Sequence, residues 1–376
     1  MTFAPALAAD SRVIVALSGG VDSAVAALLL KEQGYDVQGL FMSNWEESAD
    51  DIWCTAAQDF QDARQVAERL AIPLHPVSFA AEYRARVFEH FLSEHRAGRT
   101  PNPDVLCNRE IKFGVALRYA QRLGAARLAT GHYARLVEGA GGIELHKARD
   151  AAKDQSYFLH AVAPAELART LMPLGGLEKR VVRERARRAG LPVFDKPDST
   201  GICFVGERPF REFLERYLPR APGPVESPEG ESLGTHRGLV FYTLGQRAGL
   251  GLGGRRGRAE QPWYVAAKEA ARNALIVVQG HDHPLLSSLA LTTGPWHWLS
   301  PPPAGPVRCT VKVRYRQADQ RALLTPRADG SVHLAFAEPQ RAVTPGQYAV
   351  AYEGSRCLGG AVIETVAPPL DRSAAA

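Results

Sequence analysis

A chain of 376 residues is too long for one hydrophobic core of ordinary size, so we expect two or three domains. Its apolar fraction of 45% and charged fraction of 23% exclude a disordered or fibrous protein and fit a globular enzyme. The net charge of +5 favours a polyanionic partner only weakly, because many basic proteins bind no nucleic acid.

The five cysteines are odd in number and scattered, so they form neither a disulfide framework nor a Cys-x-x-Cys metal site, and they suit a reducing compartment. No apolar run approaches the roughly 20 residues that a membrane span needs. The first eleven residues lack the basic and apolar regions of a signal peptide and are expected to form a short disordered lead. We therefore expect a cytoplasmic protein with no membrane partner.

From Val13 to about Leu191, strand-like and helix-like patterns alternate, which predicts an α/β fold: a Rossmann-like parallel sheet wrapped by helices. The expected strands are Val13–Leu17, Val37–Met42, Leu74–Ser78 and Arg127–Thr130. The expected helices are Ala24–Gln33, Thr55–Leu70, Glu82–Ala97, Ile111–Leu123 and Lys179–Ala189. Ligands of such sheets bind beyond the carboxyl ends of the strands.

The pattern changes after residue 210. An expected helix, Arg211–Tyr217, leads into a proline-dense passage, which indicates a linker or a small turn-rich domain. Short alternating strands then predict a small β-barrel of a kind that often binds RNA. These strands are Arg308–Arg314, Val332–Phe336, Tyr348–Tyr352 and Gly359–Glu364. The predicted domains are residues 1–210, 211–282 and 283–376.

The stretch Ala16-Leu17-Ser18-Gly19-Gly20-Val21-Asp22-Ser23 predicts a phosphate-binding turn. An apolar strand leads into two glycines and a helix, so the backbone can approach an anion and the first helical N–H groups point at it. Ser18 and Ser23 add hydroxyls, and Asp22 can orient a hydrated magnesium ion. The turn lacks the Gly-Lys-Ser/Thr ending of a Walker A loop and the Gly-x-Gly-x-x-Gly dinucleotide pattern, so its use of nucleotide differs from both.

Two cysteines lie in contexts that suit thiol chemistry. Cys107 ends the stretch Pro101-Asn102-Pro103-Asp104-Val105-Leu106-Cys107, which we expect to be a stiff loop just before a helix near Ile111, and a helix N-terminus lowers the pKa of a thiol. Cys203 follows Asp198-Ser199-Thr200-Gly201-Ile202, small residues that suit a sulfur which must move between donor and acceptor. The alternative for either cysteine is a small buried apolar side chain.

Three further stretches join these motifs: Thr130-Gly131-His132-Tyr133, Lys153-Asp154-Gln155-Ser156-Tyr157-Phe158-Leu159 and Thr243-Leu244-Gly245-Gln246-Arg247. Together they make the chain closely resemble the bacterial tRNA-specific 2-thiouridylases from about Arg12 to Pro368, with a glycine turn that resembles the PP-loop of ATP pyrophosphatases. The resemblance implies replacement of the C2 oxygen of the anticodon wobble uridine by sulfur, with ATP and Mg²⁺. It also implies Glu-, Gln- or Lys-type tRNA as substrate and a sulfur-relay protein as persulfide donor.

The resemblance also implies roles for single residues. Cys203 would carry the persulfide, Cys107 would be its nucleophilic partner and end in a Cys107–Cys203 disulfide, and Asp104 would accept a proton. Direct attack of the persulfide on C2 and prior release of hydrosulfide use the same two cysteines, and both stay open. The implied nucleotide contacts are residues 16–23, Met42 and Gly131. The implied tRNA contacts are Asn102, Pro103, Asp104, His132, Lys153, Asp154, Gln155, Arg314, Tyr315 and Gln347. No metal-ligating set is implied.

Several of these residues have plainer interpretations. Asp104 is otherwise the cap of a turn, His132 a structural hydrogen-bonding residue, and Arg314 with Tyr315 ordinary solvated surface. The basic run from Lys179 to Arg188 has two interpretations, a track for phosphates and the solvated face of a helix; the second is preferred, and the run is left out of the site. The arginines of a glycine-rich loop are the better candidates for phosphate contacts: Arg255, Arg256 and Arg258.

Three other functions stay open at this point. A PP-loop ligase acting on a small-molecule carbonyl needs no thiol pair. A thiolase of another tRNA position would hold an iron–sulfur cluster, for which Cys54, Cys107 and Cys203 could supply thiolates. A non-catalytic RNA-binding module would have lost the chemistry of the glycine turn, although Ser18 and Asp22 are intact.

Overall fold

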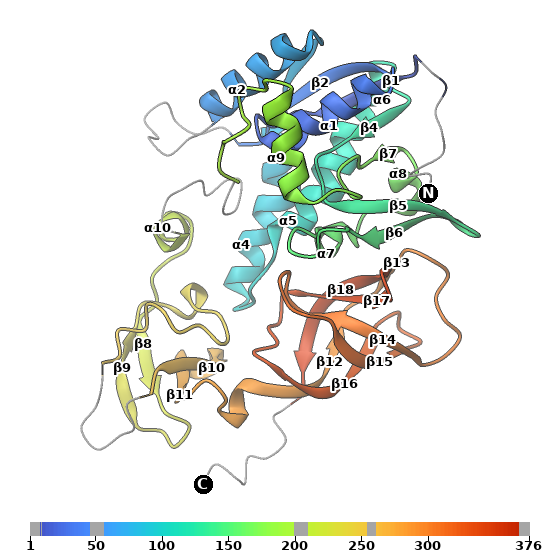
Figure 1. Ribbon diagram of the computed structural model, residues 1–376. Coiled ribbons are helices and arrows are strands. Elements are labelled where there is room, and N and C mark those ends of the chain that lie inside the picture. The colour runs from blue at the N-terminus through green and yellow to red at the C-terminus, as the bar shows by residue number, and fades with distance from the viewer. Residues whose placement is uncertain (1–7, 9, 46–55, 199–209, 254–260, 368–376) are drawn as a thin grey trace.

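The computed structural model describes residues 8, 10–45, 56–198, 210–253 and 261–367. Figure 1 shows a parallel sheet with its helices, a small four-stranded sheet, and a barrel that lies beneath the first sheet. The central sheet and the barrel both lie below the parallel-sheet domain (Figure 1). Both contact the segment of that domain around Thr100.

The parallel sheet carries the candidate site. Its order is β3-β2-β1-β4-β7, and each neighbouring pair is parallel. Its strands are β1 (Arg12–Ala16), β2 (Asp36–Ser43), β3 (Leu74–Ser78), β4 (Arg127–Ala129) and β7 (Thr170–Leu171). Val13, Ile14 and Val15 are fully buried, which is how the central strand of a sheet covered on both faces behaves. The predicted Rossmann-like class is confirmed.

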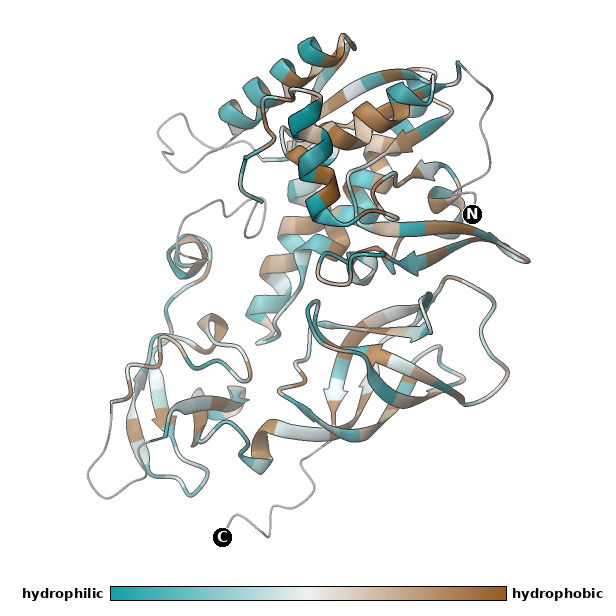
Figure 2. Ribbon diagram, viewed as in Figure 1, coloured by the Kyte–Doolittle hydropathy of each residue, from teal (hydrophilic) through white to brown (hydrophobic). Residues whose placement is uncertain are grey.

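Helices follow or cover the strands of this sheet. The α-helices are α1 (Val21–Glu32), α2 (Ala56–Leu70), α3 (Ala80–Tyr83), α4 (Glu89–Arg96), α5 (Pro103–Leu106), α6 (Leu117–Arg122), α7 (Ser156–Leu159), α8 (Pro164–Leu167), α9 (Lys179–Arg188) and α10 (Phe210–Glu215). Two π-helical stretches, η1 (Arg84–Phe88) and η2 (Cys107–Ala116), join their neighbours into longer helices. Figure 2 contrasts the largely apolar α1 with the strongly polar α9.

The predicted start of the helix at Ile111 is wrong. The helix expected from Ile111 begins at Pro103, because the Asn102 side chain caps it and proline is favoured at the first helical position. Cys107 therefore lies more than one turn inside a helix and not in a loop before it.

The central sheet has the order β10-β11-β8-β9. It contains β8 (Gly223–Glu226), β9 (Ser232–His236), β10 (Trp263–Glu269) and β11 (Ala274–Gln279), with 3-10 turns η3 (Leu239–Phe241), η4 (Ala270–Arg272) and η5 (Pro284–Leu286). The barrel runs β12-β16-β15-β14-β17-β18, and β18 pairs back with β12, which closes a six-stranded barrel within the described residues. This confirms the predicted barrel.

The strands of the barrel are β12 (Ser287–Thr293), β14 (Val307–Lys312), β15 (Gln320–Pro326), β16 (Val332–Arg341), β17 (Tyr348–Glu353) and β18 (Arg356–Val366), with β13 (His297–Trp298) paired to β18. A hairpin of the first domain, β5 (Ala134–Gly139) and β6 (Gly142–Lys147), joins this sheet through His146, which pairs with Arg356. The parallel-sheet domain and the barrel thus share backbone pairing. Among the described helices, none has the length and apolar character of a transmembrane segment.

Candidate active site

The glycine turn joins β1 to α1 and forms an open cradle of backbone and hydroxyl groups. Gly19 has φ +76°, a conformation that favours glycine, and a Cβ there would lie 2.3 Å from the Asp59 carbonyl oxygen. The Ser23 hydroxyl accepts from the Ser18 amide at 3.1 Å and donates to the Gly20 carbonyl. Within the described part of the chain, no side chain caps the first turn of α1. Its N–H groups are therefore available to an anion, and the residues present fit a nucleotide phosphate.

Two cationic side chains from distant parts of the chain reach this turn. Lys196 donates to the Gly19 carbonyl and to carboxylates of α2, Asp59 at 2.8 Å and Asp62, so it braces the back of the turn. Lys179, the first residue of α9, lies 2.7 Å from both carboxylate oxygens of Asp22. Sequence analysis assigned Lys179 to a solvated face; the structure corrects this, since its side chain is only 12% exposed.

Asp22 has a second partner, the hydroxyl of Tyr133, which donates to it at 2.8 Å. Burial and the nearby Asp22 raise the pKa of Tyr133, so the phenol keeps its proton and remains a donor. Gly131, two residues earlier, packs against the start of α1: a Cβ at this position would lie 2.7 Å from the Ser23 amide nitrogen. Only glycine allows so close an approach of two backbones.

The proline-flanked stretch forms the start of a long helix, α5 continued by η2. Asn102 Oδ1 accepts from the Asp104 amide at 3.2 Å, and Cys107 is buried, with 2% exposed. Asn108, the next residue, donates from its side-chain amide to the Phe158 carbonyl at 3.3 Å. The thiol-bearing helix is thereby connected to the Lys153–Leu159 motif.

Asp104 lies at the second position of this helix. Burial raises the pKa of its carboxyl group, and the nearby Lys112 acts in the opposite direction. A carboxylate with a raised pKa is a stronger base than an exposed one, which suits a proton acceptor. Lys112 also acts on His132, whose pKa falls well below its ordinary value because the ring is buried. His132 shares a 2.8 Å hydrogen bond with the Thr130 hydroxyl.

The segment Gly131-His132 therefore stands between the two halves of the site. Gly131 contacts the start of α1, and the His132 ring lies 5.6 Å from the ring of Phe113 on η2. This segment therefore contacts both the start of α1 and the helix that carries Asp104 and Cys107.

The Lys153-Asp154-Gln155 motif faces inward. Lys153 pairs with Asp198 at 2.5 Å, and Gln155 Oε1 accepts from the Tyr133 amide at 3.0 Å. The buried carboxylate of Asp154 accepts from two backbone amides and from the Ser156 hydroxyl. These side chains hold the loop in place, and their contacts with tRNA stay a prediction.

Asp198 gathers three cations: Lys153, Lys179 at 2.7 Å and Arg183 at 3.1 Å. Burial would raise the pKa of Asp198, but hydrogen bonds from Lys153 and Lys179 outweigh it and lower the pKa to about 2. Asp198 is therefore an anion at neutral pH. The segment that follows it, with Cys203, lies outside the described residues, as do Cys54 and the arginines at 255, 256 and 258.

The barrel residues assigned to tRNA also make internal contacts. Arg314 donates to the Ala342 carbonyl at 2.5 Å, and the Tyr315 ring lies 4.4 Å from that of Phe158. The Gln347 side-chain amide donates to the Thr100 carbonyl at 2.8 Å.

Thr100 is a junction of all three parts of the molecule. The barrel contributes the Pro345 carbonyl, which accepts from the Thr100 amide at 3.0 Å. The central part contributes Thr243, whose hydroxyl lies 3.3 Å from that of Thr100, and Lys268, which donates to the Gly98 carbonyl at 3.1 Å. The backbone that enters the Asn102 cap is therefore held from two sides.

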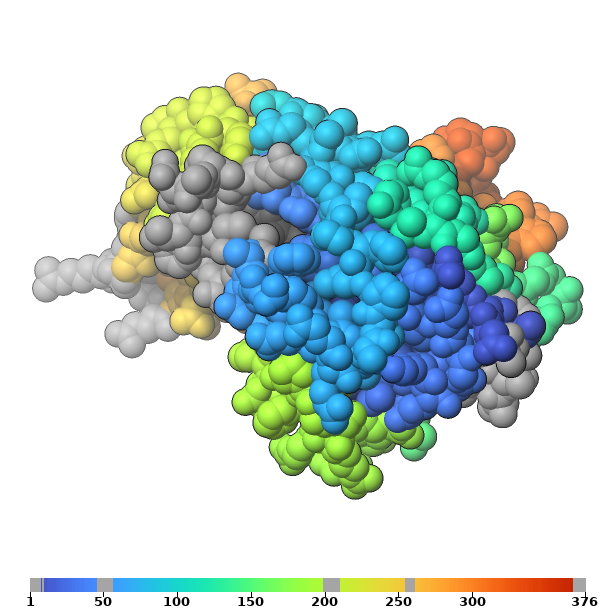
Figure 3. All heavy atoms as spheres, turned by 90° about the horizontal axis from the view of Figure 1, so that it is seen from above, coloured from blue at the N-terminus to red at the C-terminus, as the bar shows by residue number. Residues whose placement is uncertain are grey.

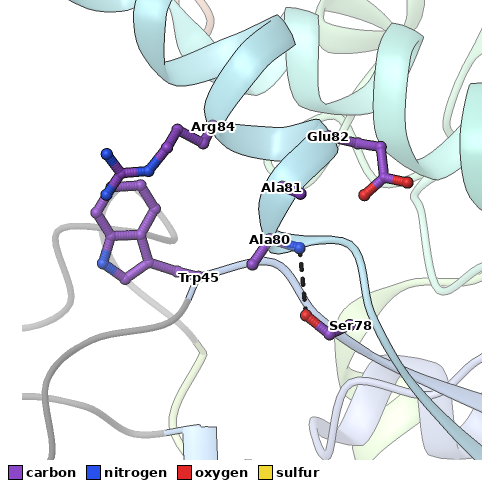
Figure 4. A pocket seen from close by; sticks show the side chains of 6 residues that line it. All are labelled: Trp45, Ser78, Ala80, Ala81, Glu82 and Arg84. Atoms are coloured by element: carbon purple, nitrogen blue, oxygen red, sulfur yellow. Dashed lines mark hydrogen bonds between the residues drawn. The ribbon is translucent and has the colours of Figure 1, made fainter.

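Met42, an implied nucleotide contact, is half-buried at the carboxyl end of β2, opposite Val77 of β3. A pocket of about 290 Å³ lies near these strand ends, lined by Trp45, Ser78, Ala80, Ala81, Glu82 and Arg84 (Figure 4). The Arg84 guanidinium covers the Trp45 ring at 5.6 Å, and the Ser78 hydroxyl accepts from the Ala80 amide (Figure 4). A second pocket contains Phe41, Ser43 and Phe60. Both pockets lie near the carboxyl ends of β2 and β3, at the edge where ligands of parallel sheets bind, and Met42 lines neither of them. Among the described residues, no group of three or more metal-ligating side chains gathers.

Three family descriptions match consecutive parts of the chain. "tRNA methyl transferase HUP domain" matches residues 11–207, "tRNA methyl transferase PRC-barrel domain" residues 211–279, and "Aminomethyltransferase beta-barrel domain" residues 288–363. The first of these covers more than half of the chain.

Curated relatives match almost from end to end. The chain is 56% identical over 356 residues to the tRNA-specific 2-thiouridylase MnmA of Methylococcus capsulatus, which covers 94% of this chain and 96% of that protein. It is 56% identical over 366 residues to the protein of the same name from Dichelobacter nodosus, with 97% of each covered. Among solved structures, a 4-thiouridine synthetase in complex with RNA and ATP matches 55% of this chain and 49% of that chain, at 19% identity and a TM-score of 0.34.

Proposed function

The chain belongs to the family of tRNA-specific 2-thiouridylases, and we propose that it replaces the C2 oxygen of the wobble uridine of tRNA by sulfur. It is an ATP-dependent tRNA sulfurtransferase. The single observation that carries the proposed division of labour is the position of Gly131-His132, between the glycine turn and the helix with Asp104 and Cys107. In this proposal the glycine turn, which binds the phosphates of ATP, and the Cys107 thiol act on the same bound uridine.

In the proposed reaction, the C2 oxygen of the flipped-out uridine attacks the α-phosphorus of ATP. The bond to the β-phosphate breaks, and pyrophosphate leaves with the electron pair. The N–H groups at the start of α1 and the hydroxyls of Ser18 and Ser23 would bind the departing phosphates. The carboxylate of Asp22 would hold a hydrated Mg²⁺, which neutralises phosphate charge when bound.

Sulfur transfer would use two thiols, Cys107 and Cys203. The outer sulfur of a Cys203 persulfide bonds to C2, and AMP leaves with the former C2 oxygen. The Cys107 thiolate bonds to the inner sulfur, and the S–S bond to the transferred sulfur breaks. The products are 2-thiouridine and a Cys107–Cys203 disulfide, which a thiol reductant reopens. Asp104 would take the proton that the uridine N3 or the incoming sulfur gives up.

The finer substrate assignments rest on the resemblance. We propose tRNAs of the Glu, Gln and Lys type, a persulfide-bearing relay protein as sulfur donor, and a cytoplasmic location. Of the predicted tRNA contacts, Asn102 and Pro103 lie at the start of α5 beside Asp104, which fits a base inserted next to the proton acceptor.

The test is mass analysis of nucleosides from unmodified tRNA incubated with the protein, Mg²⁺ and a persulfide donor, with and without ATP. We expect 2-thiouridine at the wobble position only with ATP. Pyrophosphate release without any thiolated nucleoside, from protein with reduced thiols, would contradict the assignment and favour a different acceptor.

A further inference from the structure

A Walker A loop carries its own phosphate-binding lysine, and the glycine turn of this chain has none. The fold supplies an ammonium group at the same turn from 157 residues further along the chain. Lys179 Nζ lies 2.7 Å from Oδ1 and 2.7 Å from Oδ2 of Asp22, and its side chain is 12% exposed. The glycine turn thus has a lysine beside it whose side chain is mostly covered by protein.

The position of Lys179 is set by its own helix. The Lys179 backbone amide donates to Asp150 Oδ2 at 2.9 Å, and Val182 and Ala186 are buried on the same helix. Helix α9 packs against α1, as Figures 1 and 3 show for the lime segment beside the blue one. The Tyr133 ring lies 5.8 Å from Nζ, and its hydroxyl holds the same Asp22 carboxylate. The ammonium group is therefore directed at the glycine turn.

Lys179 has one partner that it can release. An ammonium group has three N–H donors, and here two carboxylates share them: Asp22, and Asp198 Oδ1 at 2.7 Å. Asp198 is also paired with Lys153 and Arg183. When Lys179 moves one N–H from Asp198 to an incoming phosphate oxygen, Asp198 keeps two cations and is not left as an uncompensated charge.

Electrostatics gives Lys179 a second task. The Asp22 carboxylate lies at the start of α1, where a polyphosphate would bind, and like charges at such short distance repel strongly in a partly buried site. The ammonium group removes this repulsion while leaving Asp22 in place for a hydrated cation. Lys196, by contrast, is paired with Asp59 and Asp62 and braces the back of the turn.

We propose that Lys179 binds the β- and γ-phosphates of ATP and stabilises pyrophosphate as it leaves. The inference rests on the proposed function, since it assigns a residue to the adenylation step. As the bond between the α-phosphorus and the bridging oxygen breaks, the electron pair goes to pyrophosphate, and the N–H group of Lys179 that is released from Asp198 donates to one of its oxygens. The contact transfers no proton, so no further reactant is needed.

The experiment compares Lys179→Met with Arg180→Met. Arg180 is the next residue on α9, and its side chain is 84% exposed. The three readouts, all on the full chain, are pyrophosphate release with tRNA present, binding of ATP with Mg²⁺ measured by calorimetry, and binding of tRNA. For Lys179→Met we expect pyrophosphate release to fall about a hundredfold and ATP affinity about tenfold, with tRNA affinity unchanged. Arg180→Met should match the wild type in all three.

Lys179→Arg distinguishes charge from mere packing. It keeps a cation at this position and should retain ATP affinity within about threefold of wild type. The same variant tests the inference if Lys179→Met does not fold. Normal ATP binding with slow pyrophosphate release by Lys179→Arg would support the inference, because a guanidinium group keeps the charge but contacts the leaving group with a different geometry. Wild-type pyrophosphate release by Lys179→Met would overturn it, as would equal loss of ATP and tRNA binding together with a lower unfolding temperature. Failure of the wild type to release pyrophosphate would instead contradict the proposed function.

Discussion

Two helix starts carry the candidate chemistry, and they are held in opposite ways. The start of α1 is built by its own turn and is completed by side chains of the same parallel-sheet domain, Tyr133, Lys179 and Lys196. The start of α5 is capped locally by Asn102, but the backbone that enters it at Thr100 is bonded to the central part and to the barrel.

The difference separates the two half-reactions. The described side chains that contact the start of α1 belong to one domain, so we expect events at the barrel to affect the nucleotide half less than the thiol half. The thiol half depends on three parts of the chain being assembled, because Pro345, Gln347 and Thr243 all reach Thr100. A tRNA that contacts the barrel would bind the same body that positions the helix with Asp104 and Cys107.

The sharpest separation comes from the cysteines. Cys107→Ser and Cys203→Ser should each abolish formation of 2-thiouridine, because a hydroxyl neither carries a persulfide nor resolves one. Pyrophosphate release and tRNA binding should survive, since the nucleotide half is untouched. Nucleoside mass analysis, a pyrophosphate assay and a tRNA-binding assay on the same preparations check this. Thiolation by either variant would disprove the two-thiol mechanism.

Asp22→Ala tests the nucleotide half of the site, at the start of α1. It removes the carboxylate that both Lys179 and Tyr133 contact, and we expect pyrophosphate release to fall about 10²–10³-fold. Binding of tRNA should stay within the error of the measurement, because the side-chain partners of Asp22, Tyr133 and Lys179, belong to the parallel-sheet domain and not to the barrel. A variant with normal pyrophosphate release would remove Asp22 from the adenylation step.

Gly131→Ala tests the segment between the halves. The added Cβ would lie 2.7 Å from the Ser23 amide nitrogen and 2.8 Å from the Asp22 carbonyl carbon, and backbone cannot yield as a flexible side chain can. We expect a cost of about 1–3 kcal/mol, seen as a lower unfolding temperature, with weaker ATP binding. Gly141→Ala is the matched control, because nothing lies within 4 Å of the Cβ added there. Equal unfolding temperatures for the two variants would contradict the close packing.

The contact between α4 and the central part of the molecule should become less stable in acid. His95 of α4 is buried and shares a hydrogen bond with the Val240 carbonyl of the central part; burial lowers its pKa to about 4. A histidine in the unfolded chain has a pKa near 6.5. Below about pH 6.5 the unfolded chain therefore binds a proton at His95 while the folded chain does not, which favours unfolding.

The stabilisation is therefore complete above about pH 6.5 and falls by about 1.4 kcal/mol per pH unit between there and pH 4. Thermal unfolding across this range measures it. His95→Phe should flatten the profile relative to wild type, whereas His90→Phe, an exposed position on the same helix, should not. Identical profiles for wild type and His95→Phe would refute the assignment.

The smallest effect is expected at the Thr100 junction. Gln347→Ala removes the 2.8 Å hydrogen bond to the Thr100 carbonyl, and we expect thiolation to slow about fivefold at saturating tRNA. A direct contact of Gln347 with tRNA predicts a different result: weaker tRNA binding with an unchanged maximal rate. Exposed Gln33, replaced by alanine, is the control for preparation and assay.

Much of the fold was predictable because its signals are local. The strand-turn-helix of residues 13–23, the alternation up to residue 191 and the short strands of the barrel are patterns of neighbouring residues. The start of α5 was missed because two prolines in six residues indicate a loop, although Asn102 and Pro103 are also a favourable helix start. Lys179 was missed because a helix of ten residues with six basic side chains looks solvated, and burial of one of them depends on what packs against it.

The sequence by itself determined the chemistry on offer: a turn that accepts phosphate, a carboxyl group beside a thiol, and a resemblance strong enough to name the reaction. Only the tertiary structure decided which charges meet. Asp22 and Lys179 are 157 residues apart, and Thr100 and Gln347 are 247 apart. Contacts at such separations leave no periodic trace in the chain, because side chains from unrelated segments become partners only when helices and strands pack.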